Sequence, residues 1–163
     1  MFREMRRKNQ YLSERECIDI LENCTSGILA VSGDDGYPYA VPLSYVFSDG
    51  RIYFHCAKQG HKLDGIKRNN KVSFCVVGRD NVIQSEFRTA FKSVIIFGRA
   101  RILEDESEIL NSIKILAKKY SPDIPEKEHL AEIEKFRNSL CMVEIIPEHI
   151  SGKHSKEETV SNS

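Results

Sequence analysis

Residues 54–74 hold the side chains whose types and spacing best suit chemistry. An apolar run ends in His55-Cys56-Ala57, passes through the turn Lys58-Gln59-Gly60-His61-Lys62, and continues into a short basic segment. This stretch contains one acidic residue, Asp64, and five basic residues: Lys58, Lys62, Lys67, Arg68 and Lys71. Backbone N–H groups at the start of a helix, flanked by cations, suit a phosphate ester. The pattern therefore predicts an anion site at a strand-to-helix corner.

The same side chains also suit other roles. His55, Cys56 and His61 could bind a metal ion, but their spacing matches no common zinc pattern, and we expect no metal site. Cys56 could act as a nucleophile, yet no Asn or Asp partner stands in register, so a packed or ligand-facing cysteine is favoured. A lysine-rich helix is often only a solvated face. The chain lacks GxSxG, HExxH and nucleotide-loop glycine patterns, so the sequence identifies no catalytic residue.

Pro42 lies inside a run, YAVPLSYVF, that otherwise has the composition of a β-strand. Proline has no backbone N–H, so a sheet tolerates it only where that donor is not needed. Pro42 therefore predicts that one side of this strand is an edge, a bulge or a surface given to a ligand.

The elements that must position these residues begin with a helix. Ser13 and Glu16 have the spacing of a capping box, and apolar residues at 17–24 then recur with helical period. Strand-like runs follow at residues 27–31, 37–47 and 51–57, with turns at 34–36 and 48–50. Because Ser48-Asp49-Gly50 is a strong hairpin signal, we expect an antiparallel meander.

The rest of the chain adds helices and strands. The sequence predicts a helix at 61–68 and strands at 71–77 and 91–103, with Gly98 at a bend or bulge and 78–90 as a hairpin or a loop. Helices are expected at 104–120 and 125–136, and a last strand at 140–146. Tight turns without regular strand–helix alternation predict an α+β, mainly β fold. We expect a barrel of six antiparallel strands with flanking helices.

Length and composition restrict domain organisation and location. The 163 residues suit one domain at 1–154, with a polar tail at 155–163 that we expect to be disordered. The five cysteines form no CxxC pair, no apolar run is long enough for a membrane span, and the first ten residues lack a signal-peptide core. These features predict a reduced, cytoplasmic protein.

Charge restricts the partners. With 24 basic and 24 acidic side chains, no overall charge attracts nucleic acid or a membrane, and we expect neither as a partner. A basic arm near the start could contact RNA or another subunit, but a solvated terminus is favoured; it comprises Arg3, Arg6, Arg7 and Lys8.

Four segments, in their order and spacing, resemble a known family: MRRKNQYLS, GYPYAVPLSYVF, RIYFHCAKQGHKLDGIKRNNKVSF and SVIIFGRARILEDESE. The chain is similar to the flavin-binding split-barrel proteins related to pyridoxamine 5′-phosphate oxidase, and within them to the nitroimidazole-resistance type. The resemblance runs from about Met5 to Lys153 and includes the ending EIIPEHISGK. It implies a six-stranded split barrel and a homodimer with two FMN molecules at the subunit interface.

The resemblance also implies which residues bind FMN. Val41, Pro42, Leu43 and Ser44 match the strand whose backbone faces the isoalloxazine ring, and His55, Cys56 and Ala57 match the strand end beside the ribityl chain and phosphate. His61 and Lys62 match the cationic pair that grips the phosphate, and Ser93 matches a polar position near the flavin. The remaining cations, Lys67, Arg68 and Lys71, are then expected on a solvated helix face.

The chain departs from the oxidase itself. At the strand end the oxidase has a sequence similar to Tyr-Thr-Asn, whereas this chain has His55-Cys56-Ala57. In the following turn it has a sequence similar to Ser-Arg-Lys, whereas this chain has Gly60-His61-Lys62. This chain also contains no tryptophan to match the substrate-binding tryptophan of the oxidase. The resemblance thus implies an oxidoreductase that passes electrons from a nicotinamide donor to a small organic acceptor such as a nitroaromatic, rather than an enzyme that oxidises pyridoxamine phosphate. The alternatives are a haem- or deazaflavin-binding split barrel, a non-catalytic FMN-binding or regulatory module, and, least favoured, an RNA-binding barrel.

Overall fold

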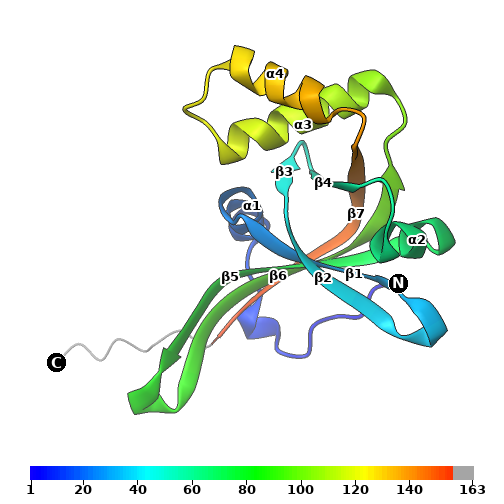
Figure 1. Cartoon of the computed structure of the whole chain (residues 1–163). Coiled ribbons are helices and arrows are strands. Elements are labelled where there is room, and N and C mark those ends of the chain that lie inside the picture. The colour runs from blue at the N-terminus through cyan, green and yellow to red at the C-terminus, as the bar shows by residue number, and fades with distance from the viewer. Residues whose placement is uncertain (156–163) are drawn as a thin grey trace.

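A curled antiparallel sheet forms the body of the protein (Figure 1). The computed structural model describes residues 1–155, so the tail expected to be disordered at 155–163 lies, apart from Ser155, outside the described residues. Within them the sheet has seven strands in the order β2-β1-β5-β6-β7-β4-β3. The strands are β1 (Ser26–Ser32), β2 (Pro38–Ser44), β3 (Val46–Ser48), β4 (Arg51–Ala57), β5 (Lys71–Ile83), β6 (Arg88–Ile102) and β7 (Leu140–His154).

Tyr45 marks the place where the barrel closes and also where it splits. The run predicted as one strand at 37–47 is divided there into β2 and β3, which pair with different neighbours. β2 pairs with β1, for example Pro42 with Ile28, whereas β3 pairs with β4, for example Val46 with Tyr53. The two end strands of the sheet are thus consecutive in the chain. The predicted α+β split-barrel fold is confirmed, and the count of seven rather than six strands reflects this change of partner.

The four described α-helices are α1 (Glu14–Asn23), α2 (His61–Arg68), α3 (Glu106–Tyr120) and α4 (Glu126–Phe136). Short 3-10 turns lie at Lys8–Gln10, Asp34–Gly36 and Gln84–Glu86. The predicted capping box is formed, because Ser13 accepts from the backbone of Glu16 while the Glu16 carboxylate accepts from the backbone of Ser13. None of these helices has the length and apolar character that a membrane crossing requires.

The hairpin of β5 and β6 is longer than the sequence predicted. Both strands extend through residues 78–90, so that segment is a hairpin, and it projects away from the barrel (Figure 1). The bulge expected at Gly98 is present, since the register between β6 and β7 shifts there. A Cβ at Gly98 would lie 2.5 Å from the carbonyl oxygen of Ile146, which explains why this position needs glycine. β7 likewise runs to His154 instead of ending near residue 146.

Two apolar clusters hold these elements together. The barrel interior is filled by fully buried side chains that include Leu29, Phe54 and Phe74. A smaller cluster joins the sheet to α3 and α4, which cover one side of the barrel in Figure 1; it comprises Leu103, Ile113, Ile133 and Met142. The faces of β1, β5 and β6 that point away from the barrel interior are called the outer face below.

Candidate functional site

Two of the predicted segments lie on strand edges beside the split in the sheet. Residues Val41 to Ser44 lie on β2, which is the terminal strand of the sheet and has only β1 as a strand neighbour. Beyond Tyr45, the pairing of β4 with β3 reaches no further than Tyr53, so His55 to Ala57 pair with β7 alone. Both segments therefore expose a strand edge at the split. The edge expected from Pro42 is confirmed.

The third predicted segment, the cationic corner, follows β4 directly. The turn at Lys58–Gly60 leads into α2, whose N-cap is Gly60 with φ of 141°, a backbone conformation that favours glycine. Gly60 supplies no side chain to accept from the first turn of the helix. Lys58 is exposed and Lys62 half-buried beside this turn. The arrangement places N–H groups and two ammonium groups at the end of β4, as the sequence predicted for an anion site.

Close packing against β1 fixes the position of α2. Leu63, Gly65 and Ile66 are buried on the face of the helix that meets the barrel. A Cβ at Gly65 would lie 2.7 Å from Val31 Cγ2 and 2.8 Å from the Ser32 carbonyl oxygen. The absence of a side chain at Gly65 thus lets the start of the helix sit close beside the split.

His61 and Arg68 attach α2 to the turn between β1 and β2. The His61 ring packs on Tyr39 with centroids 4.1 Å apart, and its Nε2 lies 3.5 Å from Asp34 Oδ2 without a hydrogen bond among the described residues. Arg68 donates to Asp34 Oδ1 at 2.7 Å and to the Gly33 carbonyl at 2.8 Å. This hydrogen bond from Arg68 holds the pKa of Asp34 below its usual value. Arg68 is exposed, as are Lys67 and Lys71, but it also has a structural role in holding the turn between β1 and β2.

The side chains of His55 and Cys56, two further candidates on β4, point to opposite sides of the strand. His55 is exposed on the side of β4 that faces away from the barrel interior, whereas Cys56 is half-buried and packs against the barrel core. Burial raises the pKa of the Cys56 thiol to about 11, and the nearby Lys62 opposes this only in part. Among residues 1–155, no three His, Cys, Asp or Glu side chains are placed to hold a metal ion, so His55, Cys56 and His61 do not assemble the alternative zinc site.

Ser93 is not brought to the split within one chain. It lies on β6, opposite Val77 of β5 and Lys153 of β7, so β1 and β5 stand between it and β2. Ser93 instead lines a cavity of about 900 Å³ that lies mainly between β7 and the N-terminal segment, with Tyr11 and His149 among the other lining residues. Leu12, whose N–H donates to the Gly152 carbonyl at 3.0 Å, attaches this segment to β7.

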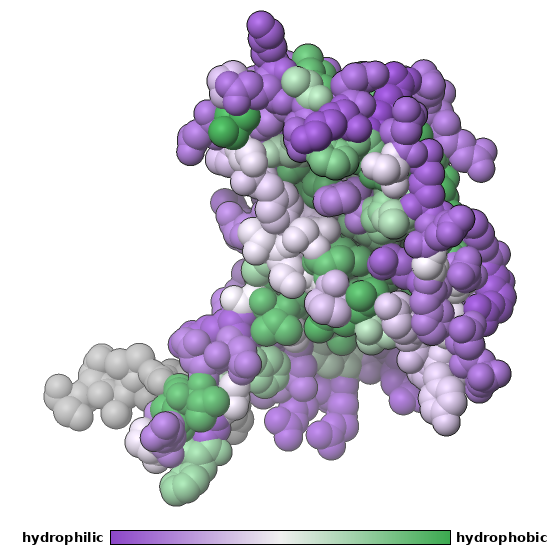
Figure 2. Space-filling model, in the orientation of Figure 1, coloured by the Kyte–Doolittle hydropathy of each residue, from purple (hydrophilic) through white to green (hydrophobic). Residues whose placement is uncertain are grey.

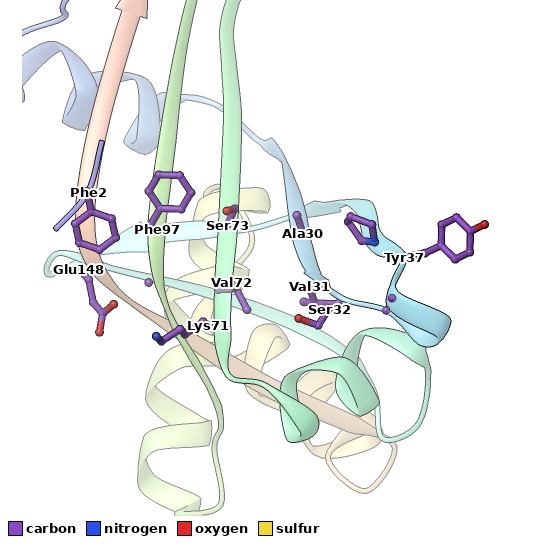
Figure 3. A pocket seen from close by; sticks show the side chains of 14 residues that line it. Phe2, Ala30, Val31, Ser32, Tyr37, Lys71, Val72, Ser73, Phe97 and Glu148 are labelled. Carbon is purple, nitrogen blue, oxygen red and sulfur yellow. The ribbon is translucent and has the colours of Figure 1, made fainter. Parts of the chain in front are cut away.

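A second pocket, of about 460 Å³, crosses β1, β5 and β6 on the outer face (Figure 3). Phe2 forms one wall, since its ring stacks on Phe97 at 5.7 Å and on His149 at 4.8 Å between centroids. Lys71 and Glu148 lie toward the same end of the pocket (Figure 3). Sequence reasoning missed this pocket. The alternation of apolar residues in β6 was a signal for Phe97, but nothing local indicated that Phe2 would meet it.

The outer face is more apolar than a solvated sheet requires. The register aligns Pro42, Ile28, Cys75 and Ile95 across four neighbouring strands. Ile28 is 39% exposed, Ile95 41% and Phe97 39%. Hydrophobic residues also gather on the surface of the barrel and on the projecting hairpin in Figure 2. Apolar patches of this kind commonly mark an interaction surface.

Comparison with known proteins identifies the family. Residues 13–154 match the family model described as pyridoxamine 5′-phosphate oxidase. The chain belongs to this family. A search of the curated proteins finds no match to the chain.

Several solved structures share the fold. An FAD-binding protein from Mesorhizobium loti is 26% identical, with a TM-score of 0.64 over 91% of this chain and 97% of that one. A candidate 5-nitroimidazole antibiotic resistance protein from Bacteroides thetaiotaomicron is 16% identical, with a TM-score of 0.72 over 88% and 86% of the two chains. An FAD- and haem-binding protein from Mycobacterium smegmatis is 18% identical, with a TM-score of 0.73 over 92% and 75%.

Proposed function

We propose that this protein is an FMN-dependent oxidoreductase that reduces a small organic acceptor with electrons from a nicotinamide donor. One observation carries the proposal: the free edge of β2, the end of β4 and the cationic start of α2 border the same split. Membership of the pyridoxamine 5′-phosphate oxidase family supports a flavin as the ligand, as does the FAD-binding protein from Mesorhizobium loti.

The residues present fit the chemistry of FMN. Lys58, Lys62 and the first-turn N–H groups of α2 suit its phosphate, which carries negative charge. The β2 edge at Val41–Ser44 suits the flat ring, because Pro42 puts no N–H there and neighbouring side chains are apolar. His61 grips the phosphate together with Lys62 in this proposal, since its Nε2 has no hydrogen bond among the described residues, and its packing on Tyr39 beside Asp34 holds the start of α2 in place.

A bound flavin supplies the electron-transfer chemistry, and the protein supplies binding, orientation and exclusion of water. We assign no nucleophilic side chain. Cys56 is packed and its pKa is raised, so its thiolate is scarce at neutral pH. His55 is the exposed polar group at the end of β4. The acceptor we favour is a nitroaromatic, with the Bacteroides protein as the fold-level precedent.

The proposed working form is a cytoplasmic homodimer with FMN at the subunit interface and no nucleic-acid or membrane partner. The aligned apolar row of the outer face supports the homodimer, because a second copy would cover it. A dimer also accounts for Ser93, which lies too far around the barrel to join the split of its own chain.

An absorption spectrum of the purified protein tests the cofactor. We expect a flavin band pair, and chromatography of the released flavin against FMN and FAD standards should identify FMN. A Soret band would identify haem as the ligand instead of FMN, and a single deazaflavin band would identify a deazaflavin. A protein that stays colourless after FMN addition would refute the proposal. Turnover with NADH or NADPH and a panel of acceptors then separates an enzyme from a passive module, in which the flavin would stay oxidised.

A further inference from the structure

Cys56 and Cys141 lie directly opposite each other on neighbouring strands. The register of β4 and β7 pairs Cys56 with Cys141, one position before the ladder ends at Ala57 and Leu140. The other three cysteines are apart from this pair: Cys17 is a buried residue of α1, Cys24 contacts the Val77 carbonyl, and Cys75 lies on the outer face. The chain thus contains one cross-strand cysteine pair among its described residues.

The two thiols share one environment. Both side chains pack against the barrel core, and each thiol influences the pKa of the other. Residues opposite each other in an antiparallel pair have Cα atoms about 4.5–5.5 Å apart, which falls inside the range of natural disulfides. Because the pair lies at the end of the ladder, β4 and β7 can adjust there without disturbing the rest of the sheet.

The surroundings of the pair combine partial burial with positive charge. Each cysteine is half-buried, so a small reagent can reach it. Lys62 lies near Cys56, and Lys67 and Lys58 lie near Cys141, where they favour thiolate over thiol. Burial outweighs these cations and raises the pKa of both thiols, so the exchange reaction should be slow, on a scale of hours.

We propose that Cys56 and Cys141 form a reversible dithiol–disulfide site whose oxidant is a low-molecular-weight disulfide of the glutathione class. In the first step, the thiolate of one cysteine attacks the oxidant, forms a mixed disulfide and releases one glutathione thiolate. In the second, the thiolate of the other cysteine attacks the protein sulfur of that mixed disulfide and releases the second glutathione. The pair loses two electrons and two protons, and glutathione disulfide takes them up as two glutathione thiols.

The site goes beyond the proposed function and does not depend on it, although Cys56 borders the split. The bond would fasten the end of β4 to β7 across a loop of about 85 residues, and a cross-link of that length restricts the unfolded chain. The oxidised protein should therefore melt roughly 10 °C above the reduced protein. A strong reductant should return the melting temperature to its starting value.

The test incubates the full chain overnight with glutathione disulfide and then counts free thiols, measures intact mass and maps the cross-link. We expect the five thiols to fall to three, the mass to drop by two hydrogens, and a peptide linking residues 56 and 141 to appear. Cys75→Ser serves as the matched control and should form the same link. Cys56→Ser and Cys141→Ser should each gain one glutathione on the remaining partner and show no rise in melting temperature.

Two results would overturn the proposal. One is a wild-type protein that keeps all five thiols or carries glutathione adducts without the link between residues 56 and 141. The other is the same fall in thiol count in Cys56→Ser and Cys141→Ser, because a different pair would then be reacting. Neither result depends on bound flavin, so a colourless protein could still confirm the disulfide.

Discussion

The hydroxyl of Tyr120 binds both backbone groups of Tyr45, the residue at which the barrel splits. The Tyr45 N–H donates to Tyr120 Oη at 3.0 Å, and the single proton of that hydroxyl is shared between the Tyr45 carbonyl at 2.9 Å and the Thr25 carbonyl. Tyr45 has no strand partner because β2, which ends just before it, pairs with β1, whereas β3, which begins just after it, pairs with β4. Tyr120, the last residue of α3, thus supplies the hydrogen bonds that a neighbouring strand would otherwise make with the backbone of Tyr45.

Tyr120→Phe should destabilise the protein because it leaves these partly buried groups of Tyr45 without a partner. We expect a loss of about 1–3 kcal/mol in the free energy of unfolding, measured by urea denaturation. Tyr37→Phe is the matched control, since Tyr37 is 76% exposed. Equal stability of the two variants would show that Tyr120 contributes nothing at the split.

Glu144 should carry much of the acid sensitivity of the fold. It is 2% exposed and accepts from Arg51 at 2.8 Å, from the Tyr53 hydroxyl at 3.1 Å and from Arg101. Burial by itself would raise the pKa of Glu144, but the hydrogen bonds from Arg101, Arg51 and Tyr53 outweigh it and hold the pKa below its usual value.

A carboxyl whose pKa is lower in the folded than in the unfolded state stabilises the fold above its unfolded pKa of 4.5, and this stabilisation is lost as the pH falls through the folded pKa. Glu144→Gln should lower the free energy of unfolding by roughly 2–4 kcal/mol near pH 7. Below pH 7, the stability of this variant should depend less on pH than the stability of the wild type. Denaturation series at several pH values measure both effects. Glu148→Gln, which removes an exposed ion pair with Arg99, should change little. An unchanged acid profile in Glu144→Gln would contradict the assignment.

Lys62→Ala should separate FMN from riboflavin. If Lys62 contacts the phosphate, its loss should weaken FMN binding by about 1.5–3 kcal/mol and leave riboflavin, which has no phosphate, nearly unchanged. Fluorescence titration of both ligands measures the difference. Lys67→Ala removes an exposed cation from the other end of α2 and should affect neither ligand. Equal weakening of FMN and riboflavin by Lys62→Ala would place the phosphate elsewhere.

Ile95→Asp should dissociate the proposed homodimer. Ile95 stands at the end of the apolar row on the outer face, and a second copy would have to bury the new carboxylate without a partner. Sedimentation analysis should show monomer for this variant and dimer for the wild type, together with loss of bound flavin. Leu110→Asp, at a similarly exposed position on α3, should remain dimeric. A dimeric Ile95→Asp protein would rule out the outer face as the interface.

Local chemistry was enough to predict most elements. The capping box at Ser13, the hairpin turn at 48–50 and the helix at 61–68 depend on residues a few positions apart, and each is present. Pro42 predicted an edge, a bulge or a ligand surface because a missing N–H is a property of that residue alone, and the structure shows an edge. The cationic corner was likewise readable, since Gly60 and its neighbouring lysines are adjacent in the chain.

Contacts between distant residues were decided only by the tertiary structure. The sequence by itself determined the strand composition, the caps and the sites of the turns, because these follow from short-range propensity and hydrogen bonding. It did not determine that Tyr45 divides a strand, that Arg68 binds Asp34, or that Cys56 faces Cys141. The division at Tyr45 and the cysteine pair depend on the register between strands, and the Arg68–Asp34 contact depends on how α2 packs against β1; no local pattern encodes either.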